Sequence, residues 1–167
     1  MRIALYQGKS LVSRLIRWQT RSQYSHAAFL LDDGSVIEAW VPCCREISST
    51  SIVQSSKLNC LSKQHTPGTR VDIFNFVCPL TREENQRLEY LARRDVGTPY
   101  DYRSILRFLT RERSSVGRHR LFCSEQVFAR CEQIGRTLLD RTKAWQVPPD
   151  WLARSPLLYL EETIVTL

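Results

Sequence analysis

One cysteine in this sequence has a setting that favours a reactive thiolate. Cys123 begins the segment CSEQVFARCEQ, and the apolar residues of 122–135 recur at helical spacing, so it lies at the N-terminus of a predicted helix. Unpaired backbone N–H groups and the helix dipole favour a thiolate there. The same groups can bind the oxyanion of an attacked carbonyl. A buried structural thiol is the alternative for Cys123, and it is the expectation for Cys131, deeper in the same helix.

A nucleophilic cysteine needs a base, and the chain has three histidines. His26 begins a predicted strand, His65 lies in a stretch rich in Ser and Thr, and His119 lies in a basic loop just before Cys123. A strand holds an imidazole more rigidly than a loop does. His26 is therefore the favoured base, although a lone strand histidine is more often only a hydrogen-bonded or exposed side chain.

Glu38 gives His26 a potential partner. The run Asp32-Asp33-Gly34-Ser35 between two apolar segments predicts a β-hairpin with strands at about 26–31 and 36–41. Such a hairpin brings positions 26 and 38 close together. A carboxylate beside an imidazole fixes its tautomer and raises its pKa, which favours a thiolate–imidazolium pair. Alternation alone leaves a solvent-facing Glu38 equally open.

The remaining pattern predicts a mixture of strands and helices without regular alternation. A mainly antiparallel sheet packed against helices, the α+β class, accounts for this order best. Residues 42–70 lack clear periodicity and are expected to border the site, where they would shape specificity. The other expected elements are strands over 2–7 and 71–77, helices over 11–18, 81–94 and from about 102 to 109, a short turn after Pro149, and a strand or tail at the end.

Three segments in this order, YSHAAFLLDDGSVIEAW, GTPYDY and FCSEQVF, resemble the permuted papain-like hydrolases of the NlpC type, in particular the YiiX-like bacterial group. The lecithin retinol acyltransferase family shares this arrangement. In ordinary NlpC-type peptidases the cysteine helix comes before the histidine strand, whereas here His26 precedes Cys123. The resemblance thus implies a circularly permuted, papain-like fold and a single catalytic domain over residues 1–167.

The resemblance also implies roles for individual residues. Cys123 is then the nucleophile, His26 the general base and Glu38 the residue that orients it. Tyr100, in the stretch GTPY, would help to bind the oxyanion, while the neighbouring Asp101 has an equally good explanation in turn packing. The reaction implied is cleavage of an amide, peptide, ester or thioester bond through an acyl-enzyme on Cys123.

Two alternatives to a cysteine amidase, peptidase or thioesterase follow from the sequence. Acyl transfer or lipid hydrolysis on the same fold would need an apolar groove, for which Leu106, Phe108 and Leu109 are candidates, although core packing explains them equally well. A non-catalytic basic module that binds nucleic acid would use the net charge of +7. The arginines are not interleaved with aromatic residues and match no known reading motif, so nucleic acid is not the expected partner.

The expected partner is an acyl- or amide-containing substrate. The net charge favours anionic ligands, whether acidic lipid, phosphorylated compounds or nucleic acid, without choosing among them. An anionic group on the substrate could be held by the arginines just before Cys123, which otherwise form a solvated loop. These are Arg111, Arg113, Arg118 and Arg120.

No cofactor or metal is expected from the motifs. The chain has no phosphate-binding glycine-rich loop, EF-hand or dinucleotide fingerprint, and the spacing of Cys43, Cys44, Cys60 and His65 fits no common zinc site. No apolar run approaches the ~20 residues of a membrane span. The first apolar stretch is too short for an export signal, so we expect a cytoplasmic protein with reduced thiols.

Overall fold

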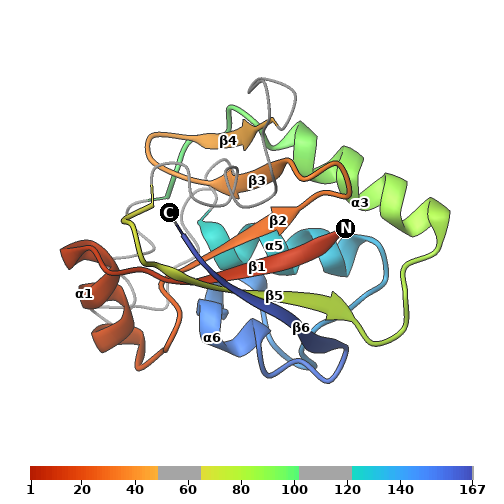
Figure 1. The fold of residues 1–167 in the computed structure, drawn as a ribbon. Coiled ribbons are helices and arrows are strands. Elements are labelled where there is room, and N and C mark those ends of the chain that lie inside the picture. The colour runs from red at the N-terminus through yellow and green to blue at the C-terminus, as the bar shows by residue number, and fades with distance from the viewer. Residues whose placement is uncertain (49–64, 102–121, 167) are drawn as a thin grey trace.

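A six-stranded sheet organises the computed structural model, which describes residues 1–48, 65–101 and 122–166 (Figure 1). The strand order is β4-β3-β2-β1-β5-β6, and every neighbouring pair is antiparallel. This confirms the predicted α+β class with a mainly antiparallel sheet. The strands are β1 (Arg2–Gln7), β2 (His26–Leu30), β3 (Val36–Ala39), β4 (Cys44–Ile47), β5 (Arg70–Phe76) and β6 (Leu158–Val165).

The hairpin between β2 and β3 is set by its turn. Gly34 has a φ of 86°, a conformation that a residue with a side chain rarely adopts. The Asp33 carboxylate accepts a hydrogen bond from the Ser35 amide at 2.8 Å. This turn pairs Leu30 with Val36 and Phe29 with Ile37, and the hairpin predicted from the Asp-Gly turn is present. The register places His26 diagonally across from Glu38.

The described helices are α1 (Leu11–Thr20), α3 (Arg82–Arg94), α5 (Cys123–Gln133) and α6 (Pro149–Leu152), with a 3-10 turn at Ala144–Gln146. The predicted capping box begins α3, because the Thr81 hydroxyl accepts from the Glu84 amide and the Glu84 carboxylate accepts from the Thr81 amide. Figure 1 shows α5 behind β1 and β2, and it contacts β2, β3 and α3. None of the described helices is both long and apolar enough to cross a membrane.

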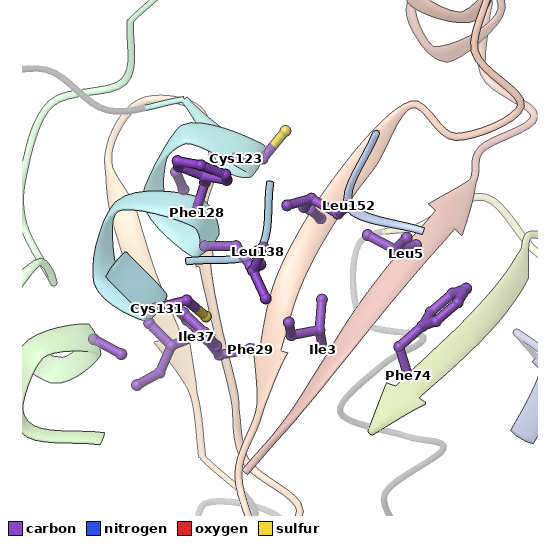
Figure 2. Packing of buried hydrophobic residues seen from close by; sticks show 14 of the residues in the cluster. Ile3, Leu5, Phe29, Ile37, Phe74, Cys123, Phe128, Cys131, Leu138 and Leu152 are labelled. Atoms are coloured by element: carbon purple, nitrogen blue, oxygen red, sulfur yellow. The ribbon is translucent and has the colours of Figure 1, made fainter. Parts of the chain in front are cut away.

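Both faces of the inner strands β1, β2 and β3 are buried, whereas the edge strand β6 is mostly exposed. On one face, odd-numbered residues such as Ile3, Leu5 and Phe29 belong to one apolar cluster with Phe128 of α5 (Figure 2). On the other face, even-numbered residues such as Ala28, Leu30 and Val36 form a second apolar cluster. His26 and Glu38 continue the even-numbered series on β2 and β3. Ionisable groups in such a setting must neutralise each other or lose their charge.

The structure adds detail that the sequence pattern did not give. The final segment is a strand, β6, paired along β5. The expected loop of 42–70 contains a further strand, β4, whose burial pattern does not alternate: Cys44 and Ile47 are buried, and the two residues between them are half-buried. A strand is recognised in a sequence by alternation of apolar and polar residues, and the sequence of β4 has no such alternation. The helix expected over 102–109 lies outside the described residues.

The core offers a test of this packing. Phe128 is completely buried between α5 and the sheet, so Phe128→Ala should lower the free energy of unfolding by about 3–5 kcal/mol in urea denaturation. Tyr90→Ala, at a 64% exposed position of α3, is the matched control and should change it by about 0.5 kcal/mol or less. Equal losses in the two variants would contradict the assigned packing.

Candidate active site

A buried ion pair between His26 and Glu38 lies at the centre of the site. The His26 Nε2 atom is 2.6 Å from the Glu38 Oε2 atom, and the Glu38 side chain is fully buried. Burial alone would lower the pKa of His26. The negative charge of Cys123 and its hydrogen bond to the ring, followed by the hydrogen bond and charge of Glu38, outweigh burial and raise that pKa from 6.5 to about 9. His26 is therefore an imidazolium at neutral pH.

The ring has a distinct partner for each nitrogen. An imidazolium has two N–H donors, and Nε2 is occupied by Glu38. Nδ1 is thus the donor that remains for the Cys123 sulfur, whose hydrogen bond contributes to the raised pKa of His26. This arrangement links the carboxylate of Glu38, the imidazole of His26 and the thiol of Cys123 through successive hydrogen bonds.

Arg45 is a second partner of Glu38. It lies directly opposite Glu38 on β4, and its Nε atom donates to the Glu38 Oε1 atom at 2.8 Å, with a further contact from Nη2. Its guanidinium lies 4.6 Å from the ring centroid of Trp40. Both carboxylate oxygens of Glu38 are thus engaged. Burial would raise the pKa of Glu38, but the hydrogen bond with His26 and the adjacent His65 hold it well below its usual range.

Aromatic side chains enclose the two histidines. The His65 ring stacks on Tyr6 at 4.2 Å and meets Trp40 edge-on at 4.9 Å, while Trp40 meets His26 edge-on at 5.0 Å. The His65 Nε2 atom lies 3.5 Å from the Glu38 Oε2 atom and has no hydrogen-bond partner in the described part of the chain. Burial lowers the pKa of His65, so its ring is neutral where His26 is charged.

Cys123 is the first residue of α5, as the sequence predicts. In Figure 2 its sulfur points away from the side chains of Phe128 and Leu138. The preceding Phe122 occupies the N-cap position, where its apolar side chain cannot accept a hydrogen bond from the first-turn amides. Two other thiols lie away from solvent. Burial raises the pKa of Cys131, which lies in the core. Burial also raises the pKa of Cys44, to about 12.

Two adjoining hollows lead to these residues. The first is lined by Cys123, Phe122 and Pro149, and the second, with a volume of about 330 Å³, by His26, Trp40 and His65, among others. Both hollows also share wall residues, namely Ile16, Ser25 and Tyr100. Tyr100 thus lines both hollows, and the hydrogen bond from its amide to the Pro42 carbonyl at 2.9 Å anchors its backbone. Its role at an oxyanion stays a prediction.

All four residues singled out from the sequence, namely Cys123, His26, Glu38 and Tyr100, border this one region. Three other predictions fall on residues outside the described part of the chain. They concern the arginine clamp, the apolar groove and one histidine, namely Arg111, Arg113, Arg118 and Arg120, then Leu106, Phe108 and Leu109, and finally His119. The same holds for Cys60 of the rejected zinc set. The Cys44 sulfur accepts a hydrogen bond from the Gln126 side chain at 3.1 Å.

Sequence reasoning missed two residues that contact Glu38. Arg45 could have been found from a hairpin centred on Val41 and Pro42, which places residues 38 and 45 opposite each other. His65 was weighed as a base and as a zinc ligand, but no local pattern connects it with Glu38. It follows a segment outside the described residues, and only tertiary structure brings it to the carboxylate.

No protein-family model matches the chain, and no curated protein matches it. Among solved structures, it is similar to the metalloprotein YiiX (DUF1105) from Escherichia coli O157:H7. The TM-score is 0.66 at 19% sequence identity, and the match covers 99% of this chain and 96% of YiiX. The chain has a YiiX-like fold. At this identity the likeness concerns the fold alone.

Within this YiiX-like fold, His26, Glu38 and His65 also form a group with the composition of a metal site. One ligand atom from each lies within 4.8 Å of the others. Two imidazoles and a carboxylate suit zinc and related transition metals. The hydrogen bond between His26 and Glu38 occupies the space that a shared metal ion would take, so a proton and a metal compete for this place.

The raised pKa of His26 makes the stability of the fold depend on pH. The folded state holds this proton up to a pKa of about 9, whereas the unfolded chain releases it near 6.5. The His26 contribution to stability is therefore complete below pH 6.5 and is lost as the pH rises through about 9. Urea midpoints measured from pH 6 to 10 should fall across this range.

Glu38→Gln is the diagnostic variant for this pH dependence. Without the carboxylate charge, the pKa of His26 should fall, which imidazole ¹⁵N NMR titration measures directly. The loss of stability should then begin at lower pH. An unchanged His26 titration in Glu38→Gln would contradict the pairing described above.

Proposed function

We propose that the protein is a cysteine hydrolase that cleaves an amide, peptide, ester or thioester bond through an acyl-enzyme on Cys123. The observation that carries the proposal is the chain of contacts from Glu38 through His26 to Cys123, in which the charges and hydrogen bonds of Cys123 and Glu38 raise the pKa of the imidazole despite its burial. An imidazolium of this kind is the partner that stabilises a nucleophilic thiolate. The order of the sequence segments and the YiiX-like fold support the same assignment.

The reaction would begin with attack of the Cys123 thiolate on the acyl carbonyl, forming a carbon–sulfur bond. The first-turn amides of α5, with the Tyr100 hydroxyl, would bind the oxyanion. His26 would then give its proton to the leaving amine, alcohol or thiol as the bond to that group breaks. Glu38 would hold the ring in place for this transfer.

Water would complete the cycle. Neutral His26 would take a proton from water as the oxygen attacks the thioester, and breaking the carbon–sulfur bond would release the acid and restore the thiolate–imidazolium pair. If an alcohol or amine replaced water, the same steps would give acyl transfer. The two outcomes differ in the acceptor and not in the roles of Cys123 and His26.

The rate of iodoacetamide labelling at each cysteine, read by mass spectrometry against pH, tests the thiolate. Cys123 should be labelled fastest near pH 7, because an ordinary thiol is only a few per cent ionised there. His26→Ala should slow labelling of Cys123 at pH 7 about tenfold or more. The measurement needs no substrate.

The protein carries its own control in Cys78, which is exposed and lies away from the site. Its labelling should not respond to His26→Ala. The proposal is overturned if Cys123 is inert, or if it reacts like Cys78 without dependence on His26.

A second candidate function is metal binding at His26, Glu38 and His65. The grouping of their ligand atoms favours it, and YiiX is described as a metalloprotein. A zinc ion there would act as a Lewis acid or a structural link. It would displace the proton on the His26 Nε2 atom, so the two functions require different states of the same imidazole.

His65→Ala separates the two functions. The amount of zinc retained after dialysis, measured by mass spectrometry, should reach one ion per chain in the wild-type protein. In His65→Ala the affinity for zinc should be lower by about tenfold or more, so that less zinc is retained. Without metal, Cys123 of His65→Ala should label as in the wild type. Metal retention that is equal in the two proteins would exclude this site, and slow labelling in metal-free His65→Ala would place His65 in the thiol machinery instead.

A further inference from the structure

Helix α1 turns its large apolar side chains toward solvent. Leu11 is 81% exposed, Trp18 76% and Leu15 50%, and no residue of the helix is buried. At 3.6 residues per turn these three fall within a sector of about 60°. Figure 1 shows α1 at the opposite end of the sheet from α3. Single exposed apolar residues are ordinary, whereas a stripe of this size on one helix marks an interaction surface.

The attachment of α1 to the sheet does not use this stripe. A Cβ atom on Gly8 would lie 2.2 Å from the Ser13 hydroxyl, so the glycine allows the helix to approach closely. The Gly8 amide donates to the Ser25 hydroxyl at 3.1 Å, and the Ser10 hydroxyl caps the helix by accepting from the Ser13 amide. Small polar residues on the inner side thus hold α1, while the outer side stays apolar.

The charged residues of α1 and of the sequence on either side of it are all positive. Lys9, Arg14, Arg17 and Arg21 lie on or beside α1, and the chain has no acidic residue before Asp32. None of these four cations forms an ion pair with an acidic side chain in the described part of the chain. A helix with Trp and Leu on one face and arginines beside it has the composition of helices that lie in the interface of an anionic membrane.

The stripe continues into the candidate active site. Val12, which is 64% exposed, and Ile16 line the hollow that contains His26, and Ile16 also lines the hollow that contains Cys123. A surface that covered α1 would therefore lie beside the mouth of both hollows.

We propose that α1 docks this protein on the surface of an anionic phospholipid bilayer. Leu11, Leu15 and Trp18 enter the boundary between headgroups and acyl chains, and Arg14 and Arg21 contact the phosphates. Docking in this way places the mouth of the site at the membrane surface. The proposal concerns binding alone and does not depend on the chemistry at Cys123.

Co-sedimentation with large unilamellar vesicles tests the proposal. The full chain should bind vesicles of phosphatidylcholine with 30% phosphatidylglycerol, and at least tenfold more weakly vesicles of pure phosphatidylcholine. Binding should weaken as salt is raised, because the headgroup contacts are screened. Leu11→Ser combined with Trp18→Ser should lower the partition coefficient at least tenfold, and Arg14→Gln combined with Arg21→Gln should reduce it mainly for the anionic vesicles.

Val77→Ser combined with Tyr90→Ser is the matched control, since it removes two exposed apolar residues elsewhere. It should bind like the wild type, and circular dichroism should show that all variants are folded. Cys123→Ser should also bind like the wild type, which separates this test from that of the hydrolase. Absence of binding to anionic vesicles, equal loss in the control, or a stable dimer that buries Trp18 and does not bind vesicles would overturn the proposal.

Discussion

A carboxylate without access to water is the constraint around which the site is arranged. The Glu38 side chain is fully buried, and an ion in that position costs several kcal/mol unless partners replace its hydration. Its strand, β3, lies between β2 and β4, and each neighbour supplies a cation, His26 from one side and Arg45 from the other. Removing one partner would leave an uncompensated charge. The order of the strands β2, β3 and β4 and the protonation of His26 therefore both serve to compensate the buried charge of Glu38.

The same constraint makes the two histidines different. His26 touches Glu38 and is influenced by Cys123, so it keeps a proton despite burial, whereas His65 is buried without a hydrogen bond to its Nε2 atom among the described residues and is neutral. A neutral imidazole is a metal ligand, and an imidazolium is not. A metal ion at this place would have to displace the His26 proton, so proton and metal are linked, and metal binding would strengthen as the pH rises.

The sequence predicted those parts of the site that are decided locally. The Asp-Gly turn sets the register that brings His26 to Glu38, and the helical spacing after Phe122 puts Cys123 at a helix start. The pairing of Cys123 with His26 was favoured because a strand holds an imidazole rigidly, and the resemblance of segment order implied it as well. No local pattern connects a helix with a strand nearly a hundred residues away. His65 reaches Glu38 through tertiary structure alone. The short β4, whose Arg45 faces the buried carboxylate, lacks the alternation that would have marked it.

Helix α1 illustrates a different limit of sequence patterns. Its periodicity correctly predicts a helix with apolar and basic faces. An amphipathic pattern does not say whether the protein core, a partner or a membrane covers the apolar face. Burial in the core is the usual answer, and here the core already closes with other residues: the sheet is covered by the clusters around Phe128 and Leu30, and α1 is held by Gly8 and Ser13. The apolar face of α1 therefore does not contribute to the packed core. Exposure of these apolar side chains to water is unfavourable in free energy. A basic interfacial helix removes them from water when it binds the surface of an anionic bilayer.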